Sequence, residues 1–128
     1  MTYEHQKEAR TFRVLMDQPT HLFKPDVAAL QQRLISEEYE EFLEAHAEAC
    51  TYIQNERARE HALKELTDLA YVCYQYAAAA GWDLDEALTR VHQSNLSKLD
   101  DDLRPIKRED GKVMKGPNYK KANLIDLV

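Results

Sequence analysis

Glycine and proline are scarce over the first hundred residues, and this scarcity limits the fold more than any other feature of the sequence. Only Pro19, Pro25 and Gly81 interrupt that stretch. The residues between them are mainly helix formers, and no segment alternates apolar and polar residues as a half-buried strand does. The sequence therefore predicts long helices that break near these three residues. With 128 residues, the chain is expected to form a single domain over residues 1–128.

Apolar residues at helical spacing divide this stretch into four main helices. The predicted helices cover residues 3–17, about 25–49, about 56–80, and a last segment from Asp83 to about residue 99. Asn55 is the expected N-cap of the third helix, and Gly81 is its expected C-terminal stop. Leu63 and Leu66 belong to a wide apolar face that should point to the core. The predicted fold class is all-α, a helical bundle of four main helices with a helical core over about residues 1–99.

A tail over residues 100–128 follows the predicted bundle. Asp110-Gly111 lies between two short extended runs, which is typical of a hairpin with a type I′ turn. The tail is basic, since residues 98–128 hold 8 basic and 6 acidic residues, whereas residues 1–97 hold 9 basic and 17 acidic residues. The acidic body and the basic tail could meet around an anion and a metal ion, although uneven surface charge alone explains the same difference.

The charge and the cysteines limit the location and the partners of the protein. A net charge of -6 argues against a general nucleic-acid binder. No apolar run approaches the length of a membrane span, and the N-terminus has no targeting pattern. Cys50 and Cys73 lack metal-site spacing and are expected to be reduced, buried thiols. A cytoplasmic protein without membrane or nucleic-acid partners is therefore predicted.

Four carboxylates in two helical pairs are the strongest functional signal. Glu38 and Glu41 are three residues apart, as are Glu65 and Asp68, so each pair leaves one face of its helix. Both pairs lie among residues that are expected to face the core. Acids that converge there repel each other unless a positive charge lies between them. An all-oxygen donor set suits Mg²⁺, with Mn²⁺ as an alternative, and Glu37 could act as a base toward the attacking water.

Two other uses of these acids were weighed. A solvated helix face carries like charges at a cost of only about 0.2–0.5 kcal/mol per pair, so the four acids alone do not prove a site. Iron-binding bundles need a histidine three residues after a glutamate on facing helices, and the sequence has no histidine at that spacing. Metal-assisted chemistry on a phosphate-bearing substrate is therefore favoured.

The last third of the chain supplies hydrogen-bond donors for such a substrate. Asn95, Lys98, Lys112, Lys115 and Tyr119 can donate to phosphate or sugar oxygens. Asp110-Gly-Lys lacks the spacing of a P-loop. The predicted phosphate contacts are therefore point charges and single donors instead of a glycine-rich cradle.

These motifs together resemble a known enzyme superfamily. Glu37-Glu38-x-x-Glu41 followed by Glu65-x-x-Asp68 resembles the signature of the all-α nucleoside-triphosphate pyrophosphohydrolases, which include MazG, the phosphoribosyl-ATP pyrophosphohydrolases and the dimeric dUTPases. The later blocks resemble the small MazG-like proteins of bacteria and phages: Gly81-Trp-Asp-Leu-Asp-Glu-Ala-Leu, Val91-His-Gln-Ser-Asn-Leu-Ser-Lys-Leu and Asp110-Gly-Lys-Val-Met-Lys-Gly-Pro-Asn-Tyr.

The resemblance implies Mg²⁺-dependent cleavage of a nucleotide between its α and β phosphates, which gives a monophosphate and pyrophosphate. It also implies an obligate homodimer or a dimer of dimers. The implied metal ligands are Glu38, Glu41, Glu65 and Asp68, and Glu37 would orient or activate water. The implied substrate contacts are Asn95 and Lys98 for the nucleotide, and Lys115 and Tyr119 for its phosphates or a lid.

Three functions follow from the sequence. The first is a pyrophosphohydrolase that removes surplus or non-canonical (deoxy)nucleoside triphosphates, and the hairpin block favours it. The second is a phosphoribosyl-ATP pyrophosphohydrolase. The third is a catalytically silent nucleotide-binding helical module, against which the intact set of four acids argues.

Overall fold

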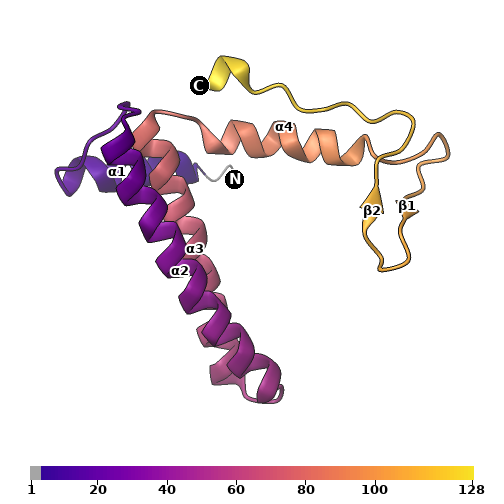
Figure 1. Ribbon diagram of the computed structural model, residues 1–128, viewed down its shortest axis with the longest axis horizontal. Coiled ribbons are helices and arrows are strands. Elements are labelled where there is room, and N and C mark those ends of the chain that lie inside the picture. The colour runs from indigo at the N-terminus through magenta and orange to yellow at the C-terminus, as the bar shows by residue number, and fades with distance from the viewer. Residues whose placement is uncertain (1–3) are drawn as a thin grey trace. The chain divides into compact units, whose positions relative to one another are not determined.

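The computed structural model describes residues 4–128, which divide into two compact units (Figure 1). The first unit ends at Trp82, and the second comprises Asp83–Val128. The described residues form four α-helices, one short 3₁₀ helix and a single two-stranded sheet, so the predicted all-α class is confirmed. None of these helices combines the length and the apolar character that crossing a bilayer requires.

Two long antiparallel helices, α2 (Pro25–Thr51) and α3 (Glu56–Ala80), make up most of the first unit (Figure 1). Proline suits the first turn of α2 because it lacks an N–H that would be unpaired there. The Asn55 side chain accepts hydrogen bonds from two N–H groups in the first turn of α3. Gly81 ends α3 in the left-handed region at φ 86°. Both caps are as predicted, which is why the predicted bounds of α3 are confirmed.

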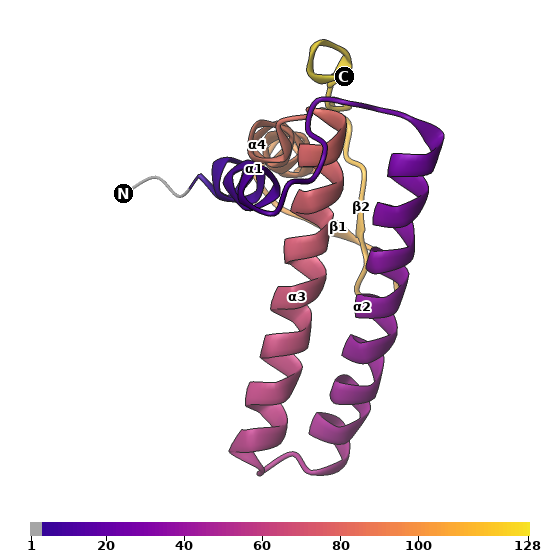
Figure 2. The ribbon, with the colours of Figure 1, turned by 90° about the vertical axis from the view of Figure 1, so that its left-hand side faces the viewer.

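Helix α1 (His5–Leu15) crosses α3 in the half that leads to Gly81 (Figure 2). Polar side chains join the two helices. Gln75 Nε2 donates to the Ala9 carbonyl at 3.3 Å, and Arg13 Nη1 donates to Gln75 Oε1 at 3.3 Å. Both Gln75 and Arg13 are buried. The contact is therefore a buried polar network as much as an apolar one.

The apolar side chains that the described residues bury are all alanines: Ala9, Ala45, Ala58, Ala77, Ala78 and Ala79. Alanine contacts let helices pack closely but remove little apolar area from water. The large residues that were expected to face the core remain accessible, since Leu63 is 64% exposed and Leu66 is 46% exposed. The prediction that this face lies in the core of one chain was wrong, because the helices bury small side chains and leave these leucines at the surface. Cys50, which was also expected to be buried, is exposed as well.

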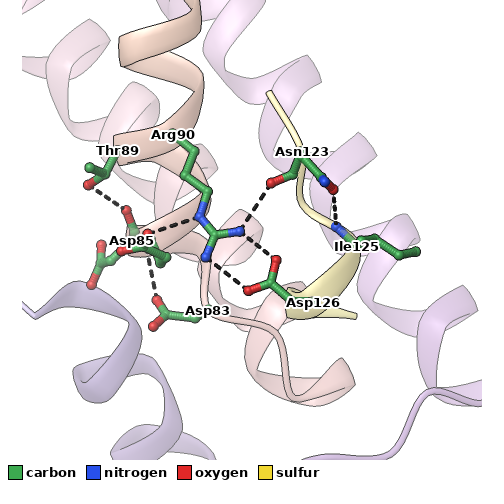
Figure 3. Close-up of polar contacts among 8 residues, drawn as sticks. Asp83, Asp85, Thr89, Arg90, Asn123, Ile125 and Asp126 are labelled. Atoms are coloured by element: carbon green, nitrogen blue, oxygen red, sulfur yellow. Dashed lines mark hydrogen bonds and ion pairs between the residues drawn. The ribbon is translucent and has the colours of Figure 1, made fainter. Parts of the chain in front are cut away.

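In the second unit the tail returns along α4 (Leu84–Leu96) and is fixed to it by Arg90 (Figure 3). The guanidinium binds both carboxylate oxygens of Asp126, at 2.6 and 3.0 Å, and donates to the Asn123 carbonyl. Its Nε also donates to Glu86. At the start of α4 the Asp83 side chain accepts from the Glu86 N–H, and the Glu86 carboxylate pairs with Arg90.

The predicted hairpin is present as β1 (Ile106–Lys107) and β2 (Val113–Met114), which pair antiparallel. Its turn differs from the predicted type I′ turn, which needs positive φ at two successive residues. In the loop only Gly111 has positive φ, at 89°. The Gly111 N–H donates to the Arg108 carbonyl, and the Arg108 N–H donates to the Lys112 carbonyl. These bonds define a three-residue loop that ends on a left-handed glycine.

Candidate metal centre

Three of the four predicted metal ligands come together between α2 and α3. Glu38, Glu65 and Asp68 each place one carboxylate oxygen so that the three oxygens lie within 4.8 Å of one another. Glu65 is buried, with 9% of its surface exposed, and Glu38 and Asp68 are half-buried. The helical spacing explains the arrangement, because Glu65 and Asp68 are one turn apart on the face of α3 that meets α2.

Two oxygens of this acidic cluster (Glu38, Glu65 and Asp68) are buried and have no hydrogen-bond donor. They are Glu38 Oε2 and Glu65 Oε2. Burial raises the pKa of Glu38 above its ordinary value, and a hydrogen bond that the protonated Glu38 donates to Glu41, together with the negative charges of Glu41, Asp68 and Glu65, raises it further. A buried acceptor without a donor is costly, so the cluster favours a positive group at this point.

Two basic side chains already approach the cluster from α3. Lys64 Nζ pairs with Asp68, and His61 Nε2 lies 3.3 Å from Glu65 Oε1. The hydrogen bond and the charge of Asp68 raise the pKa of Lys64. Our reading of the sequence did not include Lys64 in the site, although its four-residue spacing to Asp68 is the signal that could have found it. Lys64 balances part of the charge from the outer side, but neither Lys64 nor His61 pairs with the two unpartnered oxygens.

The donor set fits a hard divalent cation. All its atoms are carboxylate oxygens, and Mg²⁺ favours such oxygens together with water and phosphate oxygens. The two unpartnered oxygens, from Glu38 and Glu65, are acceptors that such an ion would satisfy. The residues therefore fit the ion that the sequence predicted.

The other two predicted acids lie at the edge of the cluster. Glu41 is exposed and outside the group of oxygens within 4.8 Å, but it forms a hydrogen bond with Glu38. Glu37 is also exposed. Their roles as the fourth ligand and as the residue that orients water stay predictions.

The predicted substrate contacts all belong to the second unit. Lys115 Nζ lies 4.9 Å from the centre of the Tyr119 ring. Gly116, between them, passes so close to the backbone just after α4 that a Cβ on it would lie 2.4 Å from the Lys98 carbonyl oxygen. Three of the predicted substrate contacts therefore lie near the point where the Gly116 backbone passes the Lys98 backbone: Lys98, Lys115 and Tyr119. Asn95 is exposed on α4.

Comparison with known proteins connects this geometry to a family. The family model described as phosphoribosyl-ATP pyrophosphohydrolase matches residues 9–95. The chain belongs to this family. The match includes the acidic cluster together with Glu37 and Glu41, and it supports an activity of the nucleotide pyrophosphohydrolase type. It therefore confirms the resemblance to the superfamily, but it does not reach the hairpin. A search of the curated proteins finds no match to the chain.

Proposed function

We propose that the protein is a Mg²⁺-dependent pyrophosphohydrolase that cleaves (deoxy)nucleoside triphosphates between the α and β phosphates, giving a monophosphate and pyrophosphate. The acidic cluster is the observation that carries the proposal. This chain belongs to a pyrophosphohydrolase family, three of its carboxylate oxygens lie within 4.8 Å of one another, and two oxygens of the cluster are buried without a donor. Removal of surplus or non-canonical nucleotides is the proposed role.

The roles of the acids follow from their positions. Glu38, Glu65 and Asp68 would hold Mg²⁺, and Glu41 would join them through its contact with Glu38. The ion would supply positive charge at the phosphates. Glu37, next to Glu38 on α2, would accept a hydrogen bond from the attacking water and orient it. Asn95, Lys98, Lys115 and Tyr119 would donate to the nucleotide and its phosphates.

Self-association is part of the proposal. The buried apolar residues of the described chain are small, and many large apolar side chains are exposed, among them Leu30, Leu63 and Leu66. Exposed patches of this kind mark interfaces, and a second copy of the chain is the partner that the family resemblance implies. We propose a homodimer or a dimer of dimers. Sedimentation velocity should give twice or four times the mass of one chain, and a monomer at micromolar concentration would contradict this.

The first experiment measures pyrophosphate release from a panel of canonical and modified (deoxy)nucleoside triphosphates, with and without Mg²⁺. Monophosphate and pyrophosphate are expected only with the metal. Glu38→Gln and Glu41→Gln should each lower turnover at least a hundredfold while leaving the helical circular dichroism unchanged. Glu40→Gln is the matched control, since Glu40 is exposed on the same helix, and it should be fully active. A fully active Glu38→Gln variant would refute the metal assignment.

Phosphoribosyl-ATP is the second candidate substrate, and the family description favours it. The hairpin block favours triphosphates, because it resembles the MazG-like proteins and lies outside residues 9–95. Phosphoribosyl-ATP therefore belongs in the same panel. If phosphoribosyl-ATP alone is hydrolysed, it is the substrate in place of the nucleoside triphosphates. If no compound in the panel is hydrolysed, the protein is better described as a nucleotide-binding module.

A further inference from the structure

A pocket lined by several polar side chains lies in the first unit, away from the acidic cluster. Its volume is about 230 Å³, and the end of α1, the loop after it and the start of α2 surround it. We call it the Arg13–Gln31 pocket, and its lining includes Arg13, Gln18, Pro19, Asp26, Leu30 and Gln31. The proposed chemistry does not use any of these residues.

Arg13 brings an incompletely used guanidinium to this pocket. The side chain is 2% exposed. Its Nε donates to the Pro19 carbonyl at 2.7 Å, and Nη1 donates to Gln75 at 3.3 Å. Within residues 4–128, no carboxylate pairs with Arg13 and Nη2 has no acceptor. A buried cation normally has a full set of partners, so a donor remains available here.

Gln31 brings the complementary group. It is 2% exposed, and its buried Oε1 has no hydrogen-bond donor in the described part of the chain. Buried polar atoms are nearly always paired in native proteins. The pocket is therefore lined by two buried polar side chains whose hydrogen-bonding capacity is not fully used, the Arg13 guanidinium and the Gln31 amide.

The position of the pocket relates it to the acidic cluster. Gln31 precedes Glu38 by seven residues of α2, which is two helical turns, so both side chains lie on one face about 10 Å apart along the axis. A nucleotide carries its phosphates and its base at opposite ends. Phosphates at the acidic cluster would direct the base along α2 toward Gln31.

We propose that the Arg13–Gln31 pocket binds the base of the nucleotide, which rests on the proposed function. Gln31 Oε1 accepts from a ring N–H or an exocyclic amino group, and Arg13 Nη2 donates to the adjacent carbonyl oxygen or ring nitrogen. We do not expect the pocket to bind a phosphate group, because phosphate oxygens are acceptors and Gln31 Oε1 needs a hydrogen-bond donor. The volume is adequate, because an engineered cavity of about 150 Å³ takes up benzene.

Steady-state kinetics of the Gln31→Met variant test the proposal. Methionine keeps the length of the side chain and removes the hydrogen-bond acceptor. The KM of the preferred triphosphate should rise about tenfold, which corresponds to one hydrogen bond, while kcat changes less than twofold and the ranking of bases becomes flatter. Gln32→Met is the matched control, since Gln32 is exposed on the same helix and its side chain donates to Ser36. An unchanged KM and ranking would overturn the proposal.

A binding measurement separates this proposal from the hydrolysis. Deoxynucleosides without phosphates are titrated into the wild-type protein, and the NMR signals of the Gln31 side-chain amide and the Arg13 Nε–H are followed. Saturable shifts of both signals support the pocket even if no triphosphate is hydrolysed. Deoxyuridine methylated at N3 should lose the effect, because it lacks the N–H donor. Shifts confined to other residues, or no saturable shift at millimolar concentration, would refute the pocket even if pyrophosphate is released.

Discussion

Replacing Glu38 with glutamine should stabilise the protein in the absence of metal. The Glu38 side chain meets other carboxylates on the facing helix, and its buried Oε2 has no donor. The amide of glutamine has nearly the same shape and carries two N–H donors. It can therefore donate to Glu65 Oε2, which is the second buried oxygen without a partner.

The size of the effect follows from these two oxygens. A buried acceptor without a donor costs about 1–3 kcal/mol, and one new hydrogen bond would relieve the oxygen of Glu65. The free energy of unfolding should therefore rise by about 1–3 kcal/mol. For a chain of this length, each kcal/mol raises Tm by roughly 4 °C, so a gain of about 4–12 °C is expected.

The pH dependence has a definite sign. Burial and the neighbouring acids raise the pKa of Glu38, so the folded protein holds a proton at a pH where the unfolded chain has lost it. Lowering the pH through this raised pKa, toward the ordinary value of about 4.3 for glutamate, therefore removes the destabilising charge. The stability difference between Glu38→Gln and the wild type should be largest at neutral pH and narrow as the pH falls.

Thermal unfolding with and without Mg²⁺ is the assay. Mg²⁺ at a hundred times its Kd should stabilise the wild type by about 2.7 kcal/mol, and Glu38→Gln should lose most of this gain. Glu40→Gln, on the exposed side of α2, should behave as the wild type in both conditions. A Glu38→Gln variant that is less stable than the wild type without metal, or one that keeps the full gain with Mg²⁺, would refute the reasoning.

Three further predictions concern helix ends and the tail. Asn55→Ala removes the cap that serves two N–H groups of α3 and should cost about 1 kcal/mol, measured by denaturant unfolding. Gly116→Ala places a Cβ 2.4 Å from the Lys98 carbonyl oxygen, so hydrogen exchange of the hairpin should become faster, whereas the exchange of α3 should not change. Hydrogen bonds from Arg90 lower the pKa of Asp126, so the tail contact should persist at pH values above that lowered pKa and weaken as the pH falls through it. Backbone NMR shifts of residues 123–127 measure this contact, and Arg90→Gln should remove the pH dependence.

Local signals predicted the helices, because their ends depend on a few nearby residues. Asn55 and Gly81 set both ends of α3, and each acts within one turn. The hairpin was predicted from the Asp110-Gly111 pair, but its turn was not. Asp-Gly fits both a type I′ turn and a longer loop with a left-handed glycine, and the pairing of the flanking strands decides between them.

The site was predicted where periodicity alone brings side chains together. The three-residue spacing of Glu65 and Asp68 put them on one face, and that face meets Glu38. Sequence reasoning did not find Arg13 or Gln31, because a polar residue on an amphipathic helix is expected to face water. Their burial depends on how α1, the loop after it and the start of α2 pack together, which is a tertiary contact without a local sequence signal.

The alanine contacts between the helices have a consequence for how this protein unfolds. A chain that buries only small apolar side chains gains little from folding alone, so a second copy would supply much of the stabilising area. Folding and association would then be a single equilibrium. The melting temperature should rise with protein concentration, and replacing Leu63, which is 64% exposed in one chain, would lower it by more than its contacts within that chain explain.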